Sequence, residues 1–382
     1  MSLDIRDAAK RGAAGTDTAP GVPSVEAGPS AGAPEREDAP RTLSSATFDD
    51  RASLVGSAVG SFGLVWIIYG SLLPTEGPLG FAICWAIGYL VTYALVTWMG
   101  NPLTVVVDRL VASLTGIAAL IVFGALASTI VYTVSQGLDA LLHLNFYTQD
   151  MAGVRPTDPL TKGGVLHAIV GSAIEVAIAS VLALPLGIGT AVYLTEVGGR
   201  MSNAVRTVVE AMTALPDILA GLFVYTVLIV ALGWGRSGFA AAVALWVTMV
   251  PIIARSAEIQ LRLVSSGLRE AGFALGSSHW AMVRRVVLPT ARSGLATALI
   301  LAIARAVGET APVLITSGAS TFLNLNPFVG PMNSLPLFTF SAVRSGQTLY
   351  IARGFGAATV LLFLVITLFA VMRVLTRQKG SR

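Results

Sequence analysis

Two residues of opposite charge, Arg305 and Glu309, stand in the apolar stretch LAIARAVGETAPVL. A charged side chain inside a membrane span costs roughly 2.5–3.5 kcal/mol on insertion scales, so its presence marks either a function or a tight pair. The two residues are four positions apart, on one face of a helix, and are close enough to pair. One interpretation is a self-neutralising ion pair that packs against a neighbouring helix. The other is a site on a translocation pathway.

Two further acidic residues fall in apolar stretches. Glu175 has no charge partner in its own helix, so it faces either the interior of a helix bundle or a wet cavity. A structural hydrogen bond to a neighbouring helix and a role in the pathway both remain open for it. Asp217 follows Pro216, where a broken helix exposes backbone groups, although it also fits the cytoplasmic end of a span.

The composition indicates a membrane protein. Of the 382 residues, 54% are hydrophobic and only 12% are charged, whereas soluble domains average about 25% charged residues. The only cysteine, Cys84, lies in an apolar run, and the three histidines show no ligand spacing, which argues against a metal enzyme. No nucleophile–base set is evident, so we do not expect an enzyme. The net charge of +4 does not indicate a nucleic-acid partner, because the basic residues collect in loops on one expected face of the membrane.

The chain contains a series of apolar stretches of about the 20 residues that cross a bilayer. We therefore predict an all-α polytopic membrane protein with about eight transmembrane helices. The predicted spans are 54–73, 79–99, 110–137, 165–194, 211–232, 238–256, 291–315 and 354–376.

Three regions follow from this pattern. Residues 1–52 are rich in Ala, Gly and Pro, and we expect a disordered cytoplasmic tail. Residues 53–109 hold two additional transmembrane helices, and residues 110–382 hold the six-helix core. Lysine and arginine concentrate in the segments that are cytoplasmic when the N-terminus is inside, so we expect both termini in the cytoplasm. The expected outer loops, of which 316–353 is rich in Asn, Pro, Ser and Gly, hold only Arg155, Lys162, Arg236, Arg344 and Arg353.

The longest polar break in the C-terminal half is the segment EAGFALGSSHWAMVRRVVLP, residues 270–289. Its apolar residues recur at roughly helical spacing, which predicts a short amphipathic helix that ends before Pro289. The charge pattern places it in the cytoplasm, where we expect something to cover it. An alternative is a helix that lies on the lipid headgroups, anchored by Trp280 and the arginines.

This segment resembles the EAA loop of permeases in bacterial ATP-binding-cassette importers. In that pattern E-A-A is followed by three residues, G, nine residues and I-x-L-P, and this chain departs from it only at Gly272 and Val286. The matching positions, within an expected coupling loop 266–290, are Glu270, Ala271, Gly272, Gly276, Leu288 and Pro289. The resemblance implies that this helix seats in a cleft of the partner ATPase and that Glu270 contacts that subunit.

The string RAVGETAP, from Arg305 to Pro312, is similar to a signature of the phosphate-type, PstA-like branch of these permeases. The resemblance covers roughly residues 160–376 and includes AVYLTE at 191–196 and LPDILAGLFVY at 215–225. It departs at Asp217, where the family is expected to have Ser, which leaves the role of that position undetermined. In these permeases the core has six helices, so the last six spans correspond to it.

The resemblance implies an ATP-driven importer of inorganic phosphate in the bacterial inner (plasma) membrane. The expected partners are a homologous, PstC-like permease subunit, an ATPase dimer, an extracytoplasmic phosphate-binding protein and membrane lipid. The chain has no GxxxxGK[ST] loop, so we expect no cofactor on it and ATP–Mg on the partner ATPase.

Phosphate also explains the residue types. A guanidinium stays protonated and offers a planar fork of donors that matches two phosphate oxygens. Arg305 is therefore the expected substrate contact, with Glu309 holding it before the substrate arrives. Thr310 has a hydroxyl that can donate to the anion, or pack, or bond to the carbonyl four residues earlier.

Two other functions fit parts of the pattern. The first is an ATP-coupled permease for another oxyanion, such as sulfate or molybdate, which the GETAP string disfavours. The second is a secondary transporter in which Arg305, Glu309 and Glu175 relay protons. The EAA match disfavours it, because a self-contained transporter needs no dock for an ATPase.

Overall fold

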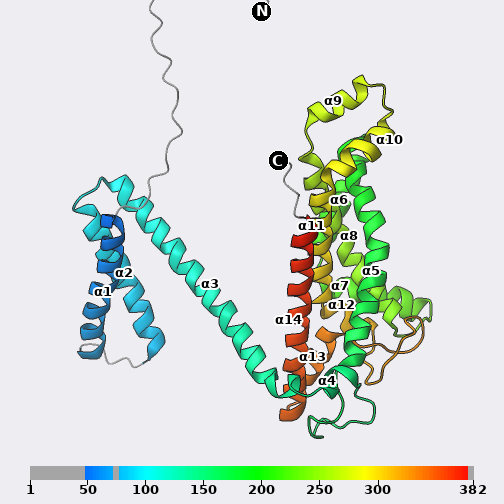
Figure 1. Cartoon of the computed structure of the whole chain (residues 1–382), viewed down its shortest axis with the longest axis horizontal. Helices are drawn as coiled ribbons and strands as arrows, with labels where there is room; N and C mark the ends of the chain where they lie inside the picture. Colours follow the sequence, from blue (N-terminus) through cyan, green and yellow to red (C-terminus); the bar gives the residue numbers. More distant parts are fainter. Residues whose placement is uncertain (1–47, 72–76, 377–382) are drawn as a thin grey trace, which may run out of the picture. The chain divides into compact units, whose positions relative to one another are not determined.

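The computed structural model describes residues 48–71 and 77–376 (Figure 1). Every regular element in these ranges is a helix, apart from one isolated bridge between Gly318 and Met332. The chain divides into two compact units, one ending at Ala118 and the other starting at Ala119. Residues 1–47 of the expected tail lie outside the described residues, whereas residues 48–52 belong to the first helix.

The first unit contains helices α1 (Phe48–Ser71), α2 (Pro78–Trp98) and the start of α3 (Leu103–Leu141). A glycine lets α1 and α2 approach, because a Cβ on Gly88 would lie 2.9 Å from a methyl group of Val65. Asp50 at the start of α1 forms an ion pair with Arg109 of α3. The first two predicted spans are thus helices that pack as an antiparallel pair.

Seven of the described helices are long and apolar enough to cross a membrane, and a bent pair raises this number to eight. The prediction of an all-α polytopic membrane protein with about eight spans is confirmed. Four of the helices extend beyond the predicted spans. Helix α1 begins six residues before 54, and α3 runs past both ends of 110–137. Helix α8 (Gly238–Arg262) ends six residues after 256, and α14 (Thr348–Thr376) begins six residues before 354.

The second unit is built around α5 (Leu166–Val192) and α8 (Gly238–Arg262), which pack against each other with α11 (Leu288–Val307) and α14 beside them (Figure 1). Small residues line the contacts. Ala179 and Ala183 of α5 and Ala241 and Ala242 of α8 are fully buried in the central cluster. Small side chains let helix backbones come close, which is how helices associate in a bilayer, where lipid is as apolar as leucine.

The predicted span 211–232 is wrong as a single helix. The chain instead forms α6 (Ser202–Ala214) and α7 (Asp217–Val224), and a π-helical stretch Tyr225–Ala231 continues α7. The two halves meet at an angle of 102°. Pro216 explains the break, because proline disfavours a helical conformation in the residue before it, and Leu215 is extended.

The predicted span 291–315 is also interrupted. Helix α11 ends at Val307, and a second, short helix α12 (Ala311–Thr316) follows after Gly308–Thr310. Pro312 lies in the first turn of α12, where a missing N–H needs no partner. The break falls between Arg305 and Pro312 and therefore inside the string RAVGETAP.

One end of the second unit is formed by α4 (Asn145–Thr148), α13 (Leu335–Val343) and the loops beside them (Figure 1). The nine-residue α13 falls inside the expected outer loop 316–353. It packs on α14, and Leu335, Leu337 and Phe338 are buried. Its apolar residues form too short a run to stand out as a span, so the sequence pattern does not reveal it.

Candidate functional site

The candidate substrate site lies where the two helix breaks of the second unit meet. Arg305 is in the last turn of α11, Glu309 lies in the gap between α11 and α12, and Asp217 is the first residue of α7. Irregular backbone at membrane depth is tolerated where it is buried in protein or lines a water-filled path. Two facing breaks with three charged residues are therefore suited to a polar substrate.

Arg305 holds an acid on each side. Its Nη2 lies 3.0 Å from Oδ2 of Asp217, and its Nε lies 3.2 Å from Oε1 of Glu309. The Arg305 side chain is 54% exposed, whereas those of Asp217 and Glu309 are 32% and 15% exposed. The pairing of Arg305 with Glu309 agrees with the prediction from their spacing, and the guanidinium remains open to a ligand.

Close backbone contact between α7 and α12 sets this geometry. A Cβ on Gly221 would lie 2.6 Å from Cα and 2.9 Å from the carbonyl oxygen of Pro312, so only glycine fits there. The carbonyl of Arg305 accepts the N–H of Gly308, and that of Ala306 accepts the N–H of Glu309, which closes the end of α11. Glycine at the contact and a tight turn thus bring Asp217 to Arg305.

Sequence reasoning did not assign Asp217 to the site. The signal was present, because a charged residue stands inside an apolar stretch directly after a proline. The pairing could not be predicted from the sequence, because Asp217 and Arg305 are 88 positions apart and no periodicity relates them. Only the fold shows that the acid and the base belong to one cluster.

Thr310 lies beside the cluster as the N-cap residue of α12, and it is half-buried. Its carbonyl accepts the N–H of Leu314, but among the described residues no hydrogen bond of its hydroxyl is found. The hydroxyl therefore remains available to a ligand, and its contact with an anion stays a prediction.

Glu175 is in a different environment, since it is fully buried in α5 and bonded to Ser317 after α12. Ser317 Oγ lies 2.7 Å from Oε1 of Glu175 and 2.7 Å from the carbonyl oxygen of Met332. A hydroxyl has one proton and a carbonyl only accepts. If Ser317 donates to Met332, the short contact with Glu175 requires a proton on the carboxyl group. None of the described contacts joins Glu175 to the Arg305 cluster.

The expected coupling segment differs from the prediction of one helix ending before Pro289. It contains α9 (Ser266–Ala274), a turn, and α10 (His279–Met282), which continues through the π-helical stretch Val283–Val287 into α11. The turn is a Schellman motif, in which the N–H of Ser277 bonds the carbonyl of Gly272 and that of Gly276 bonds Phe273. Gly276 has a φ of 78°, a left-handed conformation that glycine adopts without steric cost.

The other matched positions have distinct surroundings. Glu270 and Ala271 are exposed, whereas Gly272 is buried, and a Cβ on it would lie 3.3 Å from the side chain of Met282. Leu288 is half-buried, and Pro289 lies in the first turn of α11 after the π-helical stretch. Large apolar side chains are exposed on α9, α10 and the turn between them. They are Leu268, Phe273, Leu275 and Trp280.

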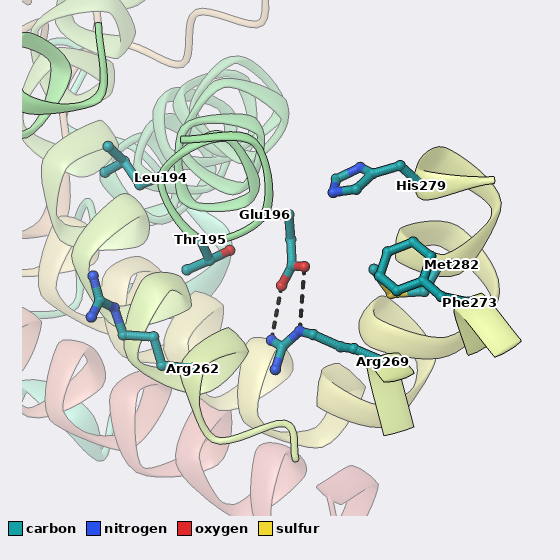
Figure 2. A pocket seen from close by; sticks show the side chains of 8 residues that line it. All are labelled: Leu194, Thr195, Glu196, Arg262, Arg269, Phe273, His279 and Met282. Carbon is teal, nitrogen blue, oxygen red and sulfur yellow. Dashed lines mark hydrogen bonds and ion pairs between the residues drawn. The ribbon is translucent and has the colours of Figure 1, made fainter. Parts of the chain in front are cut away.

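A cavity of about 530 Å³ lies between α9 and α10 and the adjoining ends of α5 and α8 (Figure 2). Its wall includes Glu196 after α5 and Arg269 of α9, which form an ion pair with distances of 2.9 and 3.3 Å. Arg269 also donates to the carbonyls of Leu261 and Val264 at the end of α8. The segment is therefore attached to both central helices of the unit. Among the described residues, no group of acids, histidines and cysteines is arranged to hold a metal ion.

Comparison with known proteins agrees with these features. Residues 183–379 match the family described as "Binding-protein-dependent transport system inner membrane component". Over 236 residues the chain is 41% identical to phosphate transport system permease protein PstA 1 of Mycobacterium tuberculosis, covering 62% of this chain and 77% of that protein. It is 39% identical to PstA of Mycobacterium leprae, with 65% and 82% covered.

A chain of the MetNI methionine ABC transporter in an inward-facing conformation is 24% identical, with a TM-score of 0.44 and coverage of 56% of this chain and 93% of that one. The expected resemblance to PstA-type permeases is confirmed by the sequence relatives. The family match covers more than half of the chain, and it includes the coupling segment and the Arg305 cluster. The chain belongs to the family of binding-protein-dependent transport system inner membrane components.

Proposed function

We propose that this chain is the permease subunit of an ATP-driven importer of inorganic phosphate and forms half of its translocation pathway. The observation that carries this proposal is the half-exposed guanidinium of Arg305, which lies where two helix breaks meet. The names of the sequence relatives favour phosphate over sulfate or molybdate as the substrate.

Arg305 is the proposed contact for the anion. Phosphate loses several kcal/mol of solvation per charge when it leaves water, and a bidentate guanidinium replaces part of it. Between transport cycles Asp217 and Glu309 hold the guanidinium in place at 3.0 and 3.2 Å. The two nearby acids also lower the affinity of Arg305 for the anion, which favours release on the cytoplasmic side. Thr310 is proposed to donate a further hydrogen bond.

The segment from α9 to α10 is the proposed dock for the ATPase. Its exposed apolar side chains suit a groove on another subunit, as an amphipathic helix does. A continuous helix runs from His279 to Val307. At about 1.5 Å per residue it spans roughly 40 Å between the dock and Arg305. Motion at the dock is thus passed as a rigid-body movement to the site.

The complex contains a homologous, PstC-like permease subunit, two ATPase subunits that bind ATP–Mg, and an extracytoplasmic phosphate-binding protein. Exposed Arg284 and Arg285 lie on the end of the second unit that carries α9 and α10, which supports a cytoplasmic position for this end. The proposed topology has both termini on the same side.

The decisive experiment replaces Arg305 with Gln and measures uptake of radioactive phosphate by the reconstituted complex. We expect uptake to fall at least a hundredfold while the complex still assembles, because a neutral amide cannot balance the anion. Arg344→Gln is the matched control, since Arg344 is an exposed arginine on the outer end that lies over the ring of Phe340. Uptake near the wild-type rate in the Arg305 variant would disprove the proposed site.

A second variant tests the dock separately. Glu270 is exposed on α9, and the resemblance to the family assigns it to contact with the ATPase. Glu270→Lys is expected to leave the membrane part folded but to abolish the stimulation of ATP hydrolysis by the loaded binding protein. Unchanged transport-linked hydrolysis would contradict the proposed coupling role.

A further inference from the structure

The Arg305 cluster contains two acids for one base, which is more negative charge than a simple ion pair needs. Asp217 contacts Nη2 of Arg305 and Glu309 contacts Nε. Among the described residues, no second cation lies within ion-pair distance of either acid. When both acids are ionised, the cluster has a net charge of −1, because two negative charges face one positive charge. An anion that binds there meets an excess of negative charge.

The two acids differ in how they face an incoming ligand. Glu309 is mostly buried and lies only four residues after Arg305, with which it forms an ion pair. Asp217 comes from another helix, is a third exposed, and contacts Nη2, one of the two terminal nitrogens of the guanidinium. Nη1, the other terminal nitrogen, has no hydrogen-bond partner among the described residues. An oxyanion that binds Nη1 and Nη2 through two of its oxygens therefore lies next to the carboxylate of Asp217.

Contact between two anionic oxygens is stable only when a proton lies between them. Inorganic phosphate carries at least one proton at neutral pH and can donate it to a carboxylate in a short, charge-assisted hydrogen bond. Sulfate and molybdate are fully ionised under the same conditions, so their oxygens only accept. Beside Asp217 such an anion leaves two acceptors facing each other without a donor, which is unfavourable away from water.

We propose that Asp217 is a specificity-determining residue, which accepts a hydrogen bond from the P–OH group of phosphate and so excludes oxyanions that carry no proton. This inference rests on the proposed function, because it assumes that Arg305 binds the anion. The selecting element is the carboxylate of Asp217 together with the two terminal nitrogens of Arg305. Arsenate carries a proton as phosphate does, so Asp217 does not exclude it.

Monofluorophosphate separates this explanation from selection by size or by the central atom. It keeps the phosphorus centre, but fluorine replaces the hydroxyl, and its oxygens are ionised at neutral pH. The complex of both permease subunits and the ATPase is purified without its binding protein, so that only the membrane part selects. Binding of radioactive phosphate is then measured in competition with arsenate, sulfate and monofluorophosphate.

For the wild-type complex we expect arsenate to compete about as well as phosphate, and sulfate and monofluorophosphate to compete at least about a hundredfold less well. A site built to pair a substrate hydroxyl rejects analogues that lack it by such factors or more. Effective competition by monofluorophosphate in the wild-type complex would overturn the proposal without any variant.

The variants Asp217→Asn and Asp217→Ala remove the charge and are expected to reduce this discrimination to tenfold or less. Asp217→Glu keeps a carboxylate and is expected to retain it. Unchanged discrimination in both neutral variants would overturn the proposal. Equal loss of binding for all the anions in intact complexes would overturn it as well, because a merely structural residue has that effect.

Arg305→Gln separates this proposal from the proposed function. If that variant still binds phosphate, then the assigned substrate contact is wrong and the role of Asp217 is wrong with it. If Arg305→Gln loses phosphate while the neutral Asp217 variants still exclude monofluorophosphate, then only the role of Asp217 is wrong.

Discussion

Arg269 of α9 and Glu196, which follows α5, form a two-point ion pair beneath the coupling segment. Nη2 of Arg269 lies 2.9 Å from Oε1 of Glu196, and Nε lies 3.3 Å from Oε2 (Figure 2). The Glu196 side chain is only 3% exposed, so water screens the pair poorly. Together with the carbonyls of Leu261 and Val264, it fastens α9 to the ends of α5 and α8.

The first prediction concerns this attachment. Replacing Glu196 with Gln removes the charge but keeps the shape, and breaking such a buried pair leaves Arg269 without compensation. We expect phosphate uptake per ATP hydrolysed to fall at least tenfold. In the variant α9 can move without α5 and α8, to which the ion pair fastens it in the wild type. Uptake and hydrolysis are measured together on the reconstituted complex.

Arg292→Gln serves as the control for Glu196→Gln, since Arg292 is exposed on α11 and no described residue forms an ion pair with it. A stoichiometry of uptake to hydrolysis that stays the same in Glu196→Gln would show that the ion pair does not transmit motion.

The second prediction concerns the turn after α9. Gly276 has a φ of 78°, a region that costs other residues about 1–2 kcal/mol. No atom lies within 4 Å of a Cβ built there, so the backbone alone resists substitution. We expect Gly276→Val to weaken recovery of the ATPase with the purified permease, and Gly276→Asn to weaken it less, because asparagine visits this region more readily. Equal recovery with both variants would rule out the conformational explanation.

The third prediction tests whether Glu175 carries a proton. Glutamine can donate from its amide to Ser317 as a protonated carboxyl group does. We therefore expect Glu175→Gln to unfold within a few degrees of the wild type, and Glu175→Ala to lose about 2 kcal/mol or more through the cavity that it leaves. Thermal unfolding of the purified protein in detergent measures both. A folded Glu175→Gln complex that no longer transports phosphate would instead assign Glu175 to the pathway.

The fourth prediction concerns Arg353, which was expected in an outer loop but lies in α14 and is only 1% exposed. Its Nη2 lies 2.8–3.0 Å from the carbonyl oxygens of Asp158, Pro159 and Lys162. Arg353→Met removes the donors that hold this loop. We expect trypsin to cleave after Lys162 several-fold faster, because the freed segment can enter the protease.

The exposed Arg344 provides the matched variant for the protease experiment, since Arg344→Gln removes an arginine from the same end of the unit without touching the loop carbonyls. The same cleavage rate in Arg353→Met and wild type would show that the loop is held by other contacts.

Much of the architecture could be predicted from local patterns. Apolar runs of spanning length located the helices, because a bilayer requires about 20 apolar residues for each crossing. The pairing of Arg305 with Glu309 was predicted from their spacing of four. The pair forms although α11 ends at Val307 and Glu309 lies beyond the helix. The EAA spacing singled out Gly276 within the expected coupling segment, and Gly276 occupies a left-handed turn there.

The sequence by itself determined the membrane class, the family resemblance and a candidate arginine for the anion, since these depend on composition and on residues close along the chain. The tertiary structure alone decided that Asp217 joins Arg305, that Arg269 meets Glu196, and that Arg353 holds a loop nearly 200 positions away. These contacts arise from helix breaks and from close approach at glycines such as Gly221. These contacts depend on the packing of segments that are distant along the chain, and local periodicity does not reveal such packing.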